Sequence, residues 1–203
     1  MNLSEQKAGE WRRRIRESGS NGRLYLIDGP SGSGKTTMTD ELLAEPELDL
    51  HFIPRHCTRE PRSNEESEYV FVSAEAFQES VDQGEFLESK DFLFGMSYGL
   101  MWSELTRPLL EGHNALALMN WGNAEQVKAL FPEARIILIT ASIDVLRRRL
   151  MSRGIHDEGQ LEERLGNARR IQSTDAHDLI IMNEDGALEE SLAQIKAFVK
   201  QGE

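Results

Sequence analysis

The sequence has a single cysteine, Cys57, in 203 residues, and no apolar run approaches the roughly 18 to 20 residues that a membrane span needs. One cysteine excludes an internal disulfide and is typical of a reducing compartment. The first 22 residues lack the apolar core of a signal peptide and are too acidic for a typical transit peptide. The sequence therefore predicts a cytoplasmic protein that does not bind a membrane.

Lysine is also scarce, since 6 of the 23 basic residues are lysine and 17 are arginine, against 35 acidic residues and a net charge of −12. This acidic total argues against a nucleic-acid polymer as partner, because phosphate backbones attract clustered positive charge. Arginine is suited to two-pronged recognition of phosphate. Seven arginines fall within residues 147–170 and three within 55–62. The composition therefore predicts small phosphate-bearing ligands bound by local arginine clusters.

Short apolar runs alternate with helical patterns along most of the chain. The runs predicted as strands are Leu24–Asp28, His51–Pro54, Ala115–Met119, Ile136–Thr140 and Leu179–Met182. The predicted helices are Lys35–Ala44, Trp102–Glu111, Asn123–Phe131, Ile143–Arg153, Glu158–Ile171 and Leu188–Lys200. Runs that are apolar on both faces suit buried parallel strands. The alternation predicts an α/β fold with a parallel five-stranded core sheet flanked by helices.

Two segments stand apart from this alternation. Residues 1–22 are predicted to form a polar arm with a short helix around Glu10 to Glu17. The stretch from Cys57 to about Gly99 is rich in aromatics and glycine, with a strand-like Tyr69–Val72 and a helical Ala74–Gln83. We interpret this stretch as a mixed α/β lobe inserted into the core.

The strongest local signal is a glycine-rich loop that follows the first predicted strand and opens a helix. It fits the pattern G-x-x-x-x-G-K-[ST] and comprises Gly29, Pro30, Ser31, Gly32, Ser33, Gly34, Lys35 and Thr36, with Thr37 next to it. Glycines let backbone N–H groups turn toward phosphate oxygens, and the helix N-terminus adds positive dipole. The loop predicts ATP binding, with Lys35 on the β- and γ-phosphates and the Thr36 hydroxyl on Mg²⁺.

Two missing features narrow the class of this nucleotide-binding protein. The guanine-reading pattern Asn-Lys-x-Asp of GTPases is absent from the sequence. The run Ala115–Met119 is followed by Asn120, whereas motor-type ATPases need an acidic residue after such a strand. A small-molecule kinase is the class that fits a chain of this length.

The motifs downstream of the loop resemble those of the guanylate kinase family over roughly residues 23–200. They are Thr58-Arg59-Glu60-Pro61-Arg62, Tyr69-Val70-Phe71-Val72-Ser73, Gly84-Glu85-Phe86-Leu87-Glu88 and Tyr98-Gly99. The resemblance implies a P-loop kinase fold that transfers the γ-phosphoryl group of ATP to the phosphate of a small acceptor, most simply a GMP-like nucleoside monophosphate. It implies that Arg59, Arg62, Tyr69 and Tyr98 hold the acceptor phosphate and that Glu88 accepts hydrogen bonds from a guanine-like edge.

The resemblance extends to an arginine-rich helical lid at about residues 149–168. The R-L-x-x-R-G and R-L elements place Arg149, Arg153 and Arg164 beside Lys35 as catalytic residues, while the helical period predicts that Val145, Leu146 and Leu150 are buried. Asn183, in a segment like the family's V-x-N-D-D, is predicted to support the site or contact the nucleotide. The implied organisation is a core of 23–54 and 100–203 and an acceptor-binding lobe of about 55–99, within a domain of 23–203.

Departures from the family pattern fall on acceptor recognition. Leu118 and Asn120 stand where the family has an acidic pair, and Arg55 stands where it has a small hydroxyl residue. We include Arg55 and Asn120 among the predicted acceptor-binding residues. Two alternatives stay open: a kinase for a non-nucleotide phosphate such as ribose 1,5-bisphosphate, which Arg55 and Asn120 favour, and an inactive binding module, against which the intact Gly34-Lys35-Thr36 argues.

Overall fold

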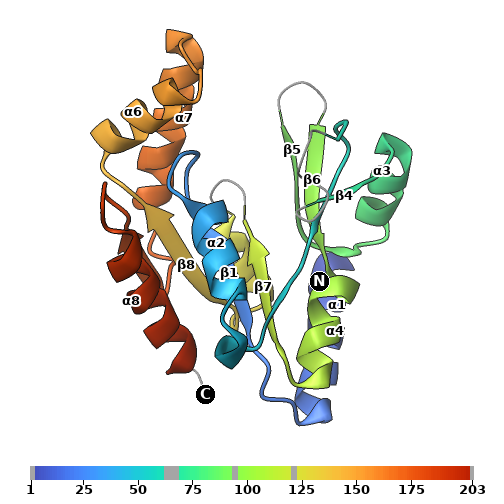
Figure 1. The fold of residues 1–203 in the computed structure, drawn as a ribbon. Helices are drawn as coiled ribbons and strands as arrows, with labels where there is room; N and C mark the ends of the chain where they lie inside the picture. Colours follow the sequence, from blue (N-terminus) through green and yellow to red (C-terminus); the bar gives the residue numbers. More distant parts are fainter. Residues whose placement is uncertain (1–2, 62–68, 93–95, 120–122, 202–203) are drawn as a thin grey trace. The chain divides into compact units, whose positions relative to one another are not determined.

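The computed structural model describes residues 3–61, 69–92, 96–119 and 123–201, with the helices and strands drawn in Figure 1. The chain divides into two compact units. The first unit comprises Met1–Leu24, His51–Ala117 and Gln126–Ala134, and the second comprises Tyr25–Leu50, Leu118–Glu125 and Arg135–Glu203. Each unit is described by itself.

The second unit is built on the strands β1 (Leu24–Asp28), β8 (Arg135–Thr140) and β9 (Leu179–Met182). β8 pairs in parallel with both of the others, with Ile137 opposite Ile27 on one side and Leu179 on the other. Every residue of β1 is buried, as expected for a parallel strand covered on both faces. The helices α2 (Lys35–Leu43) and α8 (Leu188–Lys200) pack against each other, and the short 3-10 helix η1 (Pro46–Leu48) follows α2.

The second unit also carries a helical hairpin made of α6 (Ile143–Ser152) and α7 (Glu158–Gln172), which lie side by side in Figure 1. Their contact is an apolar cluster to which α6 contributes Val145, Leu146 and Leu150, as the helical period predicted, and α7 contributes Leu161, Leu165 and Ala168. Arg148 on α6 points away from this cluster and its side chain is 62% exposed. The hairpin therefore buries one stripe of each helix and leaves its arginines on the surface.

The first unit contains a four-stranded sheet in the order β4-β3-β6-β5. Its strands are β3 (Arg55–Cys57), β4 (Tyr69–Phe71), β5 (Phe86–Phe92) and β6 (Met96–Met101), and the helix α3 (Ala74–Asp82) lies between β4 and β5 in the chain. β5 and β6 pair antiparallel, and Phe86 crosses over Gly99, where an added Cβ would lie 2.6 Å from the phenyl ring. Glycine at position 99 therefore lets Phe86 reach the core of this unit.

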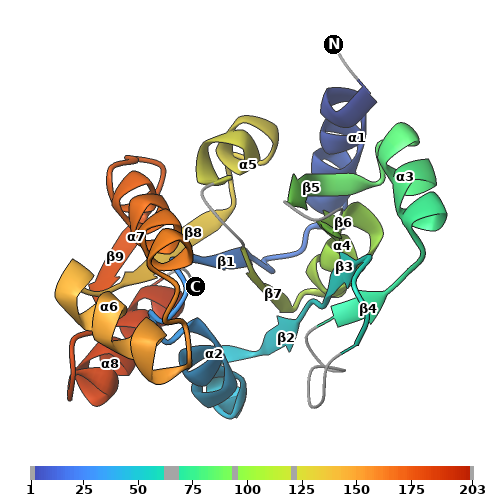
Figure 2. The same ribbon diagram turned by 90° about the horizontal axis from the view of Figure 1, so that it is seen from above.

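The first unit also contains the helix α1 (Leu3–Ser18), which packs beside α4 (Trp102–Glu111), as Figure 2 shows. Lys7 pairs with Glu85 at 2.7 Å, and Arg12 forms two hydrogen bonds with Glu133 at 2.6 and 2.8 Å. The helix is longer than the predicted Glu10 to Glu17, because contacts with the rest of the unit stabilise its first turns. Residues 3–18 are thus a packed part of the first unit.

The remaining elements complete a five-stranded sheet in the order β2-β7-β1-β8-β9. They are the strands β2 (Leu50–Phe52) and β7 (Asn114–Leu118), together with the helix α5 (Ala124–Leu130). The predicted five-stranded α/β core is confirmed, and the predicted strands and helices of the core match the observed ones to within two residues at each end. The sequence did not predict β3, β5 and β6, which we interpreted only as parts of a mixed lobe. No helix in the described part of the chain combines the length and the hydropathy that crossing a membrane requires.

Candidate functional site

The glycine-rich loop connects β1 to α2 in the second unit and has a positive φ at Gly29, Gly32 and Gly34; at Gly29 and Gly34 an added side chain would also clash. Gly29 has a φ of 147°, and a Cβ there would lie 2.0 Å from the carbonyl oxygen of Ile139. Gly34, the residue before α2, has a φ of 97°, and a Cβ there would lie 2.5 Å from the side-chain nitrogen of Asn183. The loop is therefore pressed closely against its neighbours, and its curvature depends on these glycines.

The predicted catalytic lysine lies within the loop. Lys35 is the first residue of α2, and its Nζ donates to the carbonyl oxygens of Gly29 at 2.6 Å and of Pro30 at 3.0 Å. These two hydrogen bonds hold the ammonium group of Lys35 against the backbone of the loop. Thr36 and Thr37 follow on the exposed first turn of the helix.

Two of the three predicted lid arginines contact this loop. Arg149 donates to the carbonyl oxygen of Gly32 at 3.3 Å, and Arg164 donates to the hydroxyl of Ser31 at 3.2 Å. Arg153 is exposed at the C-terminal end of α6. Pro30 and Ser31 of the loop also line a small pocket with Arg164, Asn167 and Ile171 of α7. Through Arg149 and Arg164, the hairpin of α6 and α7 brings positive charge to the loop.

The segment after β9, residues 183–185, forms hydrogen bonds and ion pairs with both the glycine-rich loop and the hairpin of α6 and α7. The buried Asn183 donates from Nδ2 to the carbonyl oxygen of Ser33 at 2.7 Å, and this bond stabilises the backbone of the loop. Glu184 accepts hydrogen bonds from the backbone N–H and hydroxyl of Ser142, the residue that precedes α6. Asp185 pairs with Arg148 at 2.7 Å and with Arg149 at 2.9 Å. We did not predict roles for Glu184 and Asp185, although the family-like N-E-D sequence marked the segment.

Three of the predicted acceptor-binding residues come together in the first unit. Arg59 donates from Nε to the hydroxyl of Tyr98 at 3.1 Å, and its guanidinium lies 4.8 Å from the ring centre of Tyr69. The two tyrosine rings meet edge to face at 5.9 Å. Stacking of the guanidinium on an aromatic ring fixes its plane, which suits two-pronged binding of a phosphate. Two further predicted acceptor-binding residues, Arg62 and Asn120, lie outside the described residues.

Arg55 and Glu88, both predicted to bind the acceptor, form an ion pair with each other. Nη1 of Arg55 lies 2.5 Å from Oε1 of Glu88, and the side chains are 2% and 0% exposed. Arg55 is on β3 and Glu88 on β5, with β6 between these strands in the sheet. Sequence reasoning missed this pairing, because the two residues are far apart in the chain and their strands were not predicted. Leu118, at the position of a family acid, is buried at the end of β7.

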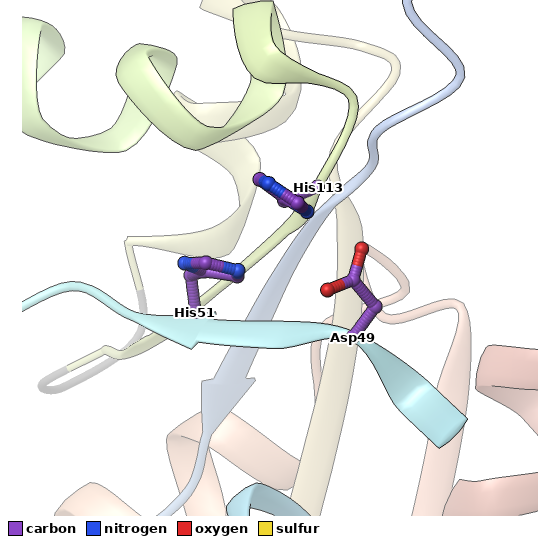
Figure 3. Close-up of side chains that lie close together, drawn as sticks. All are labelled: Asp49, His51 and His113. Atoms are coloured by element: carbon purple, nitrogen blue, oxygen red, sulfur yellow. The ribbon is translucent and has the colours of Figure 1, made fainter. Parts of the chain in front are cut away.

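A second group of polar side chains lies away from the glycine-rich loop in the chain. The rings of His51 and His113 stack with their centres 4.4 Å apart, and Asp49 precedes His51 by two residues (Figure 3). Stacking brings ring faces together, whereas imidazole binds a metal through a lone pair in the ring plane. We therefore assign this histidine pair to packing. Cys57 is fully buried, which agrees with an inert thiol.

Comparison with known proteins identifies the family of this chain. The family model described as guanylate kinase matches residues 21–202. The chain is 31% identical over 183 residues to a guanylate kinase of Shewanella sp. (strain MR-7), covering 88% of this chain and 87% of the relative. It is 35% identical over 186 residues to a guanylate kinase of Pseudomonas fluorescens (strain Pf-5), covering 89% and 88%. The crystal structure of guanylate kinase from Anaplasma phagocytophilum matches with a TM-score of 0.68 and 25% identity, covering 89% of this chain and 85% of that one. The chain has the P-loop kinase fold and belongs to the guanylate kinase family.

Proposed function

We propose that this protein transfers the γ-phosphoryl group of ATP to the phosphate of GMP, giving ADP and GDP. The observation that carries the proposal is the glycine-rich loop, with Lys35 held against its carbonyl oxygens and with Arg149 and Arg164 in contact with it. An inactive binding module has no need of such an arrangement. Membership of the guanylate kinase family supports a nucleoside monophosphate as the acceptor.

The proposed reaction needs positioning and positive charge rather than covalent catalysis. Phosphoryl transfer spreads negative charge over the transferred group, so cations held at that group lower the barrier. Lys35 supplies one such cation, and Arg149, Arg153 and Arg164 supply others from the hairpin of α6 and α7. The acceptor is itself a phosphate, and its attacking oxygen is already ionised near neutral pH. A dedicated general base is therefore unnecessary.

The first turn of α2 fits a magnesium ion. Mg²⁺ in phosphoryl-transfer sites keeps several waters and takes one or two protein oxygens together with substrate phosphates. The Thr36 hydroxyl follows Lys35 directly, on an exposed turn beside backbone amides suited to phosphate. When bound there, Mg²⁺ would offset the charge of the ATP phosphates, and Thr36 would hold it in place.

The described acceptor-binding residues of the first unit are suited to bind both the phosphate and the base of GMP. Arg59, Tyr69 and Tyr98 form a preassembled group suited to the acceptor phosphate. Glu88 is the residue that family resemblance assigns to the base, and its buried carboxylate is held by Arg55. Guanine offers adjacent N–H donors that a carboxylate can accept together. The Arg55–Glu88 pair is therefore the proposed site of base recognition.

A coupled assay of ADP release tests the proposal. The acceptors compared are GMP, dGMP, AMP, CMP, UMP and ribose 1,5-bisphosphate, with a reaction lacking acceptor as the background. We expect turnover with GMP to exceed that with the other bases by at least about 100-fold, because a site built around hydrogen bonds rejects a base that leaves them unmade. Turnover with ribose 1,5-bisphosphate and not with any nucleoside monophosphate would refute the proposed acceptor.

A further inference from the structure

Asp28 and His177 form a buried pair at the base of the glycine-rich loop. Nε2 of His177 lies 3.0 Å from Oδ2 of Asp28, and both side chains have 0% exposure. Asp28 is the last residue of β1, whereas His177 lies two residues before β9. Both belong to the second unit. Neither residue has a role in the site as described above.

The other oxygen of the Asp28 carboxylate holds the first peptide of the loop. Oδ1 accepts a hydrogen bond from the backbone N–H of Gly29 at 2.8 Å. The carbonyl oxygen of the same Gly29 accepts from Lys35 at 2.6 Å. The bonds on either side of Gly29 together fix a backbone conformation with a φ of 147°, which is reached only by glycine. A chain of contacts thus runs from His177 through Asp28 and Gly29 to the ammonium group of Lys35.

The burial of this pair is unfavourable unless the contact with the loop compensates for it. A buried carboxylate needs a donor for each oxygen, and here the donors are the Gly29 amide and His177. In the part of the chain that the structure describes, Nδ1 of His177 is buried and has no hydrogen-bond partner. An unsatisfied buried nitrogen lowers stability, so an apolar residue would serve packing alone better than histidine does.

We propose that Asp28 and His177 are positioning residues for the phosphate-binding loop. His177 orients the Asp28 carboxylate, the carboxylate fixes Gly29, and Gly29 places Lys35 for the ATP phosphates. The inference rests on the proposed function only in that the loop binds ATP. Loss of the pair therefore weakens ATP binding and leaves the affinity for the acceptor unchanged, because the acceptor-binding residues that the structure describes lie in the first unit.

The experiment compares His177→Ala and His177→Gln with wild type, using calorimetry with Mg-ATP in the absence of acceptor and steady-state kinetics with GMP. We expect His177→Ala to raise the Kd for ATP about tenfold, the loss of one directed hydrogen bond to a charged group. The KM for GMP should stay within about twofold of wild type. His177→Gln keeps an N–H donor for Asp28 and should restore ATP binding to within about threefold of wild type.

Asp178→Ala is the matched control, because Asp178 anchors the same segment at a different place. Its carboxylate accepts from the backbone N–H of Ile136, at the start of β8. This variant should lower the melting temperature and leave the Kd for ATP unchanged. If folded His177→Ala binds ATP as wild type does, or if His177→Gln binds as weakly as His177→Ala, the positioning role is wrong. If His177→Ala does not fold, His177→Gln alone tests the proposal. A folded His177→Gln that binds ATP about tenfold more weakly than wild type would contradict it, because this variant keeps the N–H donor for Asp28.

The same measurements separate this inference from the proposed function. Calorimetry with Mg-ATP reports on the loop even if GMP is never phosphorylated. A wild-type protein that binds ATP and shows no turnover with GMP would refute the proposed acceptor while the comparison of His177 variants stands. Normal turnover with GMP together with unchanged ATP binding in His177→Ala would refute only the positioning role.

Discussion

The polar contacts of the site go mainly to the loop backbone in the second unit, where Arg164 on the Ser31 hydroxyl is an exception, and mainly to other side chains in the first unit. In the second unit, the side chains of Lys35, Arg149 and Asn183 donate to backbone carbonyl oxygens of the loop. In the first unit, Arg55 and Arg59 contact other side chains, namely Glu88 and Tyr98. A loop held through its backbone depends on a short local pattern of glycines. Contacts between side chains depend on which strands lie close together, so they are free to change while the fold persists.

The largest expected effect is on the activity of variants of the glycine-rich loop in the second unit. Replacing Lys35 by Ala removes the cation that the loop holds, and we expect kcat with ATP and GMP to fall at least about 1,000-fold. Lys196→Ala is the control, since Lys196 pairs with Glu45 elsewhere in the same unit at 2.5 Å. ADP release at saturating substrates measures both. Activity of Lys35→Ala within about tenfold of wild type would contradict the role of the loop.

The Arg55–Glu88 pair gives the next largest effect, measured as the free energy of unfolding in urea. Removing one partner of a buried ion pair leaves an uncompensated charge, so Arg55→Ala should cost about 3–5 kcal/mol. The double variant Arg55→Met/Glu88→Leu should recover most of that loss, because apolar residues of similar volume tolerate burial. Arg147→Ala removes a partner of Glu158 and Glu162 on the surface and should cost less than about 1 kcal/mol. Equal losses for Arg55→Ala and Arg147→Ala would contradict the burial of the first pair.

Glu88→Gln tests the base-reading role of the same pair with little change of shape. The amide cannot accept two N–H groups as the carboxylate does, so we expect the KM for GMP to rise about tenfold or more while the KM for ATP stays constant. Steady-state kinetics at varied GMP, with the melting temperature as a check of folding, measures the effect. GMP kinetics equal to those of wild type would remove Glu88 from base recognition.

A smaller effect is expected at Arg59, whose guanidinium stacks on Tyr69 and donates to Tyr98. Arg59→Lys keeps the charge and loses the planar fork, so the KM for GMP should rise about tenfold with the KM for ATP unchanged. Tyr98→Phe removes one hydrogen bond and keeps the ring, and we expect a rise of about threefold. A larger effect of Tyr98→Phe than of Arg59→Lys would show that the arginine is not the main phosphate ligand.

The smallest effect concerns the packing of α1. The hydrogen bonds from Arg12 hold the pKa of Glu133 below its usual value of 4.5. A lowered carboxyl pKa stabilises the folded protein at pH values above the unfolded-state pKa. This stabilisation is lost as the pH falls through the folded-state pKa. The difference in melting temperature between wild type and Arg12→Ala should therefore shrink from about pH 6 to about pH 3. Glu133 is half-exposed, so the effect at neutral pH stays below about 1 kcal/mol. A constant difference over this range would contradict the assignment.

Much of the second unit could be predicted, because its strands are apolar on both faces and its loop follows a local rule. β1, β9 and α8 lie at the predicted residues. The strands around Arg55 and Glu88 were not predicted, since short half-polar strands such as β3 leave little periodicity. The first turns of α1 were missed for a related reason, as contacts with other segments stabilise them.

The sequence by itself determined the phosphate-binding loop, the α/β alternation and the family of this protein, because each depends on residues that are close together in the chain or on a recurring period. Only the tertiary structure decided that Arg55 pairs with Glu88 and that His177 lies against Asp28. These partners are separated by many residues and meet only where strands and loops are brought together. Local patterns specify backbone geometry, whereas the pairing of distant charges depends on the packing of the folded chain.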